Sequence, residues 1–240
     1  MKVFALSDVG MVRSVNQDAF HVPAVDENFA VVADGMGGHR AGEVASEIAV
    51  REFVRWLRCA PRPEEEAMRY AVSEANRAIY YKAKAEPDKM GMGTTITGIW
   101  FDKSRAYLAH VGDSRAYLLR NGRITQVTRD HSLVGEMIER GEITPEEART
   151  HPQRHFITRA VGTSSYVCPD IDSFDSRPGD IWLLCSDGLS NYVEANEMKS
   201  VLMGGGQWQE KIAELMGRAL ERGGADNITV LVVVLDGGAV

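Results

Sequence analysis

The stretch that decides the fold is TTITGIWFDKSRAYLAHVGDSRAYLLRNGRITQV, residues 94–127. It contains short runs rich in β-branched, aromatic and other apolar residues, separated by turn residues, at 94–101, 105–111, 115–119 and 123–127. The dipeptide Asn121-Gly122, between the last two runs, favours a two-residue hairpin. Consecutive strands joined by such short turns predict an antiparallel sheet, in which Asp113 lies between the two strands of a hairpin.

Segments on either side of this stretch add further strands and helices. Apolar runs predict strands at 29–33, 181–185 and 228–235. Apolar residues at helical spacing predict helices at about 40–58, 64–84 and 208–220. The order of these elements lacks a regular βαβ alternation, so we expect an α+β fold.

The length fits one large domain or two small ones, and 44% apolar residues can fill a core. Because no Pro/Gly/Ser-rich linker divides the chain, we expect a single domain spanning 1–240. With 27 basic and 34 acidic residues the net charge is -7, which disfavours a nucleic-acid partner. The three cysteines form no CxxC pair, so we expect a cytoplasmic protein. The longest apolar run, 228–235, is far shorter than the roughly 20 residues of a membrane helix, and we expect no membrane association.

Aspartates recur at the ends of the expected strands. Asp34 and Asp187 each follow an apolar run, Asp113 lies in a turn, and Asp226 precedes the last strand. Taken singly, Asp-Gly pairs are ordinary turn dipeptides. If these strand ends share one rim, however, the carboxylates converge and require cations, and oxygen ligands select Mg²⁺ or Mn²⁺.

Six ordered segments set these aspartates in a larger pattern. They are 7–18 (SDVGMVRSVNQD), 32–39 (VADGMGGH), 91–95 (GMGTT), 111–115 (VGDSR), 184–189 (LCSDGL) and 226–229 (DNIT). In this order they resemble the motifs of the bacterial PP2C-type (PPM) protein phosphatases, over nearly the whole chain. The resemblance implies a four-layer αββα sandwich, two antiparallel sheets flanked by helices, with a metal cluster at one end.

The resemblance also implies the ligands of two Mn²⁺ or Mg²⁺ ions and of a third site found in bacterial members. Asp34 would bridge two ions, with the carbonyl of Gly35 completing the second. Asp187 and Asp226 would complete the first ion. Asp18 would serve the second ion, directly or through water. The third site would use Asp113 together with Asp187.

The implied reaction is hydrolysis of phosphoserine and phosphothreonine in proteins by a metal-bridged hydroxide. Arg13 resembles the phosphate clamp, because a guanidinium forms a charged fork that matches phosphate oxygens. Eukaryotic relatives place a histidine where this chain has Met36, which cannot transfer a proton. His39 is the candidate proton donor in its place; the alternatives are that a metal-bound water is the acid and that His39 only orders the loop.

The segment 131–160 is rich in Glu, Arg and His, and we expect a helical insert that resembles the family's flap beside the active site. His131, His151 and His155 flank or lie in it, whereas His110, within an apolar strand, is expected to be a core histidine. The partners implied are phosphorylated proteins, including a bacterial Ser/Thr kinase. We expect the protein itself to be a monomer. The alternatives are a non-catalytic phosphoprotein-binding member and a phosphatase of small phosphate esters.

Overall fold

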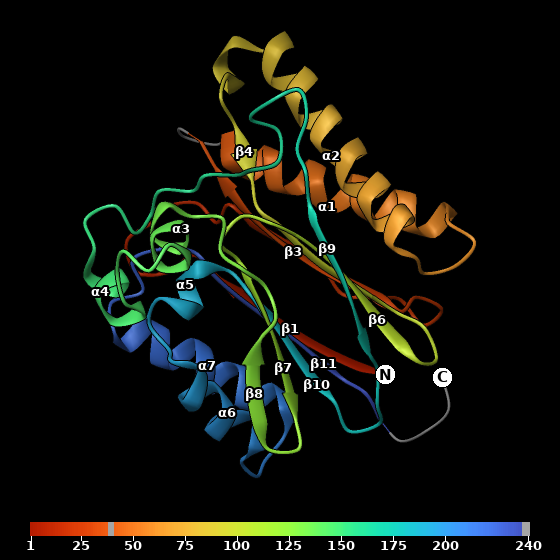
Figure 1. Cartoon of the computed structure of the whole chain (residues 1–240), viewed down its shortest axis with the longest axis vertical. Helices are drawn as coiled ribbons and strands as arrows, with labels where there is room; N and C mark the ends of the chain where they lie inside the picture. The colour runs from red at the N-terminus through yellow and green to blue at the C-terminus, as the bar shows by residue number, and fades with distance from the viewer. Residues whose placement is uncertain (38–40, 237–240) are drawn as a thin grey trace.

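Two antiparallel sheets pack face to face in the computed structural model, which describes residues 1–37 and 41–236 (Figure 1). The five-stranded sheet has the order β1 (Lys2–Asp8), β11 (Ile228–Val234), β10 (Ile181–Cys185), β7 (Arg115–Arg120), β8 (Arg123–Gln126). The six-stranded sheet has the order β2 (Asp18–His21), β3 (Phe29–Met36), β5 (Ile96–Phe101), β6 (Arg105–Val111), β9 (Asp170–Asp175), with β4 (Gly93–Thr94) paired to β3.

Helices cover the outer face of each sheet (Figure 1). On the six-stranded sheet lie α1 (Ala41–Cys59) and α2 (Glu65–Ala85), whose apolar faces share one core with strand residues such as Val31 and Ile96. On the five-stranded sheet lie α6 (Ala195–Met203) and α7 (Trp208–Glu221), which share a second core with β10 and β11. A third core fills the space between the sheets. The predicted α+β fold and its αββα layering are therefore confirmed.

Strand β11 shows how the sequence produces these layers. All seven of its residues are buried, because helices cover one face and the second sheet covers the other. Val230 and Val232 belong to the core under the helices, whereas Leu231 and Val233 belong to the core between the sheets. The two-residue period of a strand thus distributes one apolar run between two cores.

The predicted hairpin at Asn121-Gly122 is confirmed, since both residues have positive φ angles, 52° and 72°. The hairpin around Asp113 is wrong. Strand β6 belongs to the six-stranded sheet and β7 to the five-stranded one, so Asp113 lies where the chain crosses between sheets. Gly112 permits this sharp crossing with a φ of 113°.

The segment 131–160 contains two short helices, α3 (Leu133–Glu139) and α4 (Pro145–Thr150), and otherwise irregular backbone. Each begins with a side-chain cap: Ser132 accepts from the Gly135 amide, and Thr144 forms a capping box with Glu147. The two helices contact each other, and Figure 1 shows them together with the short α5 (Asp187–Ser190), which follows β10. The rest of the predicted insert is loop.

Among the described residues, the sequence patterns miss β1, β2, β9 and α6, besides the single-turn helices α5 and Pro87–Lys89. Strand β9, DIDSFD, is polar and lies at the edge of its sheet, and β2 has only four residues. Such strands carry little apolar periodicity. Among the described helices, none is long and apolar enough to cross a membrane.

Candidate metal centre

Asp18 and Asp34 face each other across two neighbouring strands. The register of β2 and β3 places their Cα atoms opposite one another. Asp34 lies inside β3 rather than in a turn after it, and its backbone is fixed to Thr95: the Asp34 amide donates to Oγ1 at 2.8 Å, and the Thr95 amide donates to the Asp34 carbonyl at 2.8 Å. Both aspartates are thus attached to rigid sheet backbone.

The other three aspartates come from strand ends at the same end of the sandwich. Asp113 lies at the crossing from β6 to β7, Asp187 is the first residue of α5 directly beyond β10, and Asp226 lies just before β11. The charges of Asp18, Asp113, Asp187 and Asp226 each act on Asp34. The convergence predicted for these carboxylates is therefore present in the structure.

This convergence raises the pKa of several carboxyl groups. Burial, and then repulsion by the other four aspartates, holds the pKa of Asp34 well above its ordinary value. Burial is the main cause for Asp18, Asp113 and Asp187 as well, and a neighbouring aspartate adds to the rise in each pKa. Ionised carboxylates in such a place are unfavourable unless cations neutralise them.

Three of the carboxylates each keep one buried oxygen without a hydrogen-bond partner among the described residues. Oδ1 of Asp18, of Asp113 and of Asp187 is buried without a hydrogen-bond partner. Oδ2 of Asp18 accepts from the hydroxyls of Ser186 (2.8 Å) and Thr229 (2.7 Å). These bonds leave only Oδ1 of Asp18 for a further ligand, and acceptor-only oxygens suit hard divalent ions.

The carboxylates are not yet closed around a common point. Among residues 1–37 and 41–236, no three acidic, His or Cys side chains form a ready-made coordination shell. Two are held by neighbours: Asp226 accepts from Arg13 Nη2 at 2.9 Å, and Asp187 Oδ2 accepts from Asn191 Nδ2 at 2.9 Å. The backbone brings the five residues to one end of the sandwich, while hydrogen bonds to neighbours hold two of the side chains.

Gly35 lies where α1 meets β3. A Cβ atom on Gly35 would come within 2.1 Å of the Gly42 carbonyl oxygen and 2.6 Å of the Gln17 carbonyl oxygen. Only glycine permits this approach. The absence of a side chain brings the start of α1 and the backbone of Asp34-Gly35 into contact at the aspartate cluster.

Arg13 lies on the loop formed by residues 9–17, at the edge of the cluster. Its side chain is half exposed and pairs with Asp226. The hydrogen bond that Arg13 donates to Asp226 is the largest cause of the raised pKa of Arg13, and the charges of Asp34 and Asp187 contribute. The guanidinium is therefore permanently charged beside the site and has one edge open to solvent.

Asn227 fixes this loop, a role that the motif alone does not reveal. Its buried amide donates Nδ2–H bonds to the carbonyls of Val9 (2.9 Å) and Val15 (3.0 Å), and its Oδ1 accepts from the Gln17 amide at 2.8 Å. Ser186 and Thr229, which orient Asp18, are likewise uncharged. In the sequence, the only signal that could have pointed to Ser186, Asn227 and Thr229 is that they lie next to or near Asp187 and Asp226.

The histidines fall into different places. His39 lies outside the described residues, so its role stays a prediction. His110 is a buried core residue as expected: its ring nitrogens contact Thr97 Oγ1 (3.0 Å) and the Arg129 carbonyl (2.9 Å), and burial is the main cause that lowers its pKa to about 4. His155, on the exposed loop after α4, lies near enough for its charge to lower the pKa of Asp187, against the larger effect of burial.

Comparison with known proteins identifies the family. A family model described as Protein phosphatase 2C matches residues 12–236. The chain is 42% identical to the serine/threonine protein phosphatase PstP of Mycobacterium tuberculosis over 97% of its own length but 44% of PstP, so it spans less than half of that relative. It is 41% identical to the serine/threonine phosphatase stp of Listeria welshimeri, covering 95% of this chain and 93% of the relative.

A solved structure agrees with this assignment. The catalytic domain of PstP, in complex with two manganese ions, matches with a TM-score of 0.88 at 40% identity, covering 96% of both chains. The structural likeness thus extends over the whole sandwich, including the end that carries the aspartates. The chain belongs to the protein phosphatase 2C family.

Proposed function

We propose that the chain is a metal-dependent protein phosphatase that removes phosphate from phosphoserine and phosphothreonine. The observation that carries this proposal is the set of five aspartates at one end of the sandwich, with three buried carboxylate oxygens unpaired, next to Arg13. Named phosphatases at about 40% identity support the reaction class.

The metal ions would be held by oxygen ligands. Asp34 would bridge two Mn²⁺ or Mg²⁺ ions, with the Gly35 carbonyl and Asp18 serving one and Asp187 and Asp226 the other. A third ion would use Asp113 together with Asp187. The manganese ions in the PstP domain support this choice. When bound, such ions supply a low-pKa water nucleophile and neutralise the phosphoryl oxygens.

The protein's own residues bind and orient the substrate. Arg13 would exchange its contact with Asp226 for the phosphate oxygens, since its fork matches both. Asn227 keeps the arginine-bearing loop in place during this exchange. The hydroxyls of Ser186 and Thr229 hold Oδ2 of Asp18, so that Oδ1 remains directed toward the cation.

His39 is proposed as the group that gives a proton to the leaving serine or threonine oxygen. Substrate proteins would lie against the flap formed by residues 131–160, which carries exposed side chains such as Phe156. We further propose that residues 1–240 form one catalytic domain, acting as a cytoplasmic monomer that opposes a Ser/Thr kinase.

The test is hydrolysis of phosphoserine and phosphothreonine peptides with and without added Mn²⁺. We expect turnover that a chelator abolishes, and Asp34→Ala to lower kcat by about 10³-fold or more, because several kcal/mol of charge stabilisation are lost. Full activity in either condition would refute the metal mechanism. Equilibrium binding without turnover would favour a non-catalytic binder, and higher kcat/KM on p-nitrophenyl phosphate and metabolite esters than on peptides would favour a small-ester phosphatase.

A further inference from the structure

His131 joins the base of the flap to the turn that carries Asp113. Both main-chain polar groups of Gly112 bond to it: the Gly112 amide donates to His131 Nδ1 at 3.0 Å, and the His131 amide donates to the Gly112 carbonyl at 2.7 Å. At the far end of the flap, the Thr158 amide donates to the His131 carbonyl at 2.8 Å. His131 therefore contacts the turn at Gly112 and also joins the two ends of the flap.

These contacts determine the protonation of the ring. A backbone amide can only donate, so Nδ1 of His131 is an acceptor and carries no proton. The proton of the neutral ring is then on Nε2, which lies 3.1 Å from Oδ2 of Asp170. His131 is buried, and burial is the main cause that lowers its pKa, which agrees with this neutral form.

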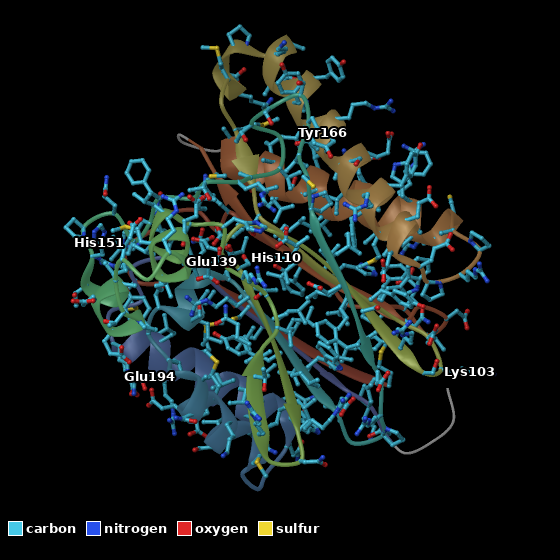
Figure 2. All side chains as sticks on the ribbon, viewed as in Figure 1. Lys103, His110, Glu139, His151, Tyr166 and Glu194 are labelled. Carbon is cyan, nitrogen blue, oxygen red and sulfur yellow. The ribbon has the colours of Figure 1, made fainter. Side chains whose placement is uncertain are left out.

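The surroundings keep the ring in this orientation. The ring of His110 lies against that of His131, with 4.9 Å between centroids, and is itself fixed by hydrogen bonds on both nitrogens. Figure 2 shows His110 in the interior of the molecule, whereas His151 lies at its outer edge. The contact between His131 and Gly112 is thus part of the packed interior.

The turn itself has little freedom to adjust. A Cβ atom on Gly112 would approach Thr95 Cγ2 to 2.5 Å, and Ser114 Oγ is 2.8 Å from Thr95 Oγ1. Between these two fixed residues the Asp113 side chain leaves Oδ1 buried and unpaired. Gly112 is thus held by its packing against Thr95 and by its two hydrogen bonds to His131. Asp113 is the next residue in the chain, so these contacts determine its position.

We propose that His131 is a positioning residue that holds Asp113 for a divalent cation and ties that position to the base of the flap. The proposal rests on the proposed function, in which Asp113 is a cation ligand. It adds the residue that would allow the flap, where substrate binds, to affect cation binding at Asp113.

Two substitutions separate the contacts of the ring. His131→Asn keeps an acceptor oxygen near the position of Nδ1 but loses the group that faces Asp170. His131→Gln keeps a donor near the position of Nε2 but loses the acceptor for Gly112. A matched control is His151→Gln, because Nδ1 of His151 also accepts a backbone amide, that of Gln153 at 3.2 Å, within the flap.

The first readout is calorimetric titration of the metal-free protein with Mn²⁺. We expect His131→Gln to weaken the weakest Mn²⁺ site about tenfold, as loss of a group that orients a ligand does. His131→Asn should weaken it less than about threefold, and His151→Gln should leave it unchanged. Both His131 variants lose ring packing, so a lower Tm in both is expected and does not discriminate.

The second readout is amide hydrogen exchange at residues 112–114 in the metal-free protein, which should accelerate in His131→Gln more than in His131→Asn. Equal effects of the two substitutions in both readouts, or a Gln variant that behaves like the His151 control, would overturn the proposal. An Asp113→Asn variant whose Mn²⁺ titration equals that of the parent would overturn it as well. The proposed function would survive that result if Asp34→Ala is still inactive.

Discussion

The two ends of the sandwich treat buried carboxylates in opposite ways. At the end away from the site, Asp180 accepts two bonds from the Arg120 guanidinium, at 2.7 and 2.6 Å, and Glu27 accepts from His21 and Arg58. At the site, Asp34 is surrounded by other aspartates. Acids that serve the fold are thus paired with basic side chains. At the site Arg13 pairs with Asp226, but one buried oxygen each of Asp18, Asp113 and Asp187 has no partner among the described residues, where by the proposed function metal ions would act.

The pKa values of Glu27, just before β3, and of Asp34, near the end of β3, shift in opposite directions. Before β3, burial opposes ionisation of Glu27, but bonds from the Ala24 amide, Arg58 and His21 outweigh it and lower the pKa of Glu27 to about 2. Within β3, burial and repulsion raise the pKa of Asp34. At the site, uncharged side chains such as Asn227 hold the backbone by hydrogen bonds. The loop around Arg13 is therefore held in place without basic side chains that would neutralise the aspartates.

The largest expected contrast is between the arginines of the two ends. Arg13→Ala should lower kcat/KM for a phosphothreonine peptide by about 10²- to 10³-fold through loss of a charged phosphate contact, with little change in Tm. Arg120→Ala should keep kcat/KM within about threefold but cost about 1–3 kcal/mol of stability, because Asp180, 1% exposed, loses both guanidinium bonds and keeps the bond from the Arg177 amide. Steady-state kinetics and thermal unfolding of both variants make the comparison; an Arg13 variant with normal kcat/KM would contradict it.

Removing the Asn227 side chain tests whether the loop that carries Arg13 is held in place by uncharged groups. Asn227→Ala leaves three backbone groups of the arginine-bearing loop without their partner. We expect a loss of about 1–3 kcal/mol in unfolding free energy and, because the loop is displaced, a roughly tenfold loss of kcat/KM. Ser200→Ala, at an exposed helix position, is the control; a stable Asn227 variant with normal kinetics would show that the loop needs no such anchor.

The smallest expected effect is on the Tm of the metal-free protein, where substitutions of Asp34 and Glu27 should act in opposite directions. Asp34→Asn should raise its Tm by about 3 °C or more and Glu27→Gln should lower it by a similar amount, since about 1 kcal/mol corresponds to 2–4 °C at this size. The folded pKa of Asp34 is raised, so its ionised form destabilises the fold above that pKa and the penalty disappears below the unfolded value. The gain from Asp34→Asn should therefore be larger at pH 8 than at pH 5.

Glu27 follows the reverse rule. Its folded pKa is lowered, so its contribution is complete above the unfolded value near 4.5 and is lost as pH falls toward 2. Thermal scans of both variants without metal at pH 8, 5 and 3 would reveal these trends. Shifts of the same sign for Asp34→Asn and Glu27→Gln at pH 8 would contradict the contrast between the two ends.

Much of the fold and the aspartate cluster could be predicted from the sequence, because apolar runs ending in Asp mark strand ends. The pattern predicts convergence of Asp34, Asp113, Asp187 and Asp226 only if these strand ends share one rim, and Asp34 lies inside β3 rather than at its end. The crossing at Asp113 could not be predicted, since a short turn between two strands looks the same whether they pair or enter different sheets. The role of Asn227 was also hidden, because its contacts join residues more than 200 positions apart.

One exposed ion pair lies at the end of the sandwich away from the aspartates. Lys2 Nζ lies 3.3 Å from Asp236 Oδ2, at the far ends of the neighbouring strands β1 and β11. Strand β11 alone spans about 23 Å, and Asp226 and Asp236 lie two residues beyond its two ends, so the ion pair is more than about 23 Å of strand away from the aspartate end. A phosphorylated segment joined there by a tether needs more than about seven extended residues to enter the site of its own chain. Shorter tethers would permit dephosphorylation only between molecules, so tether length would determine whether the rate depends on protein concentration.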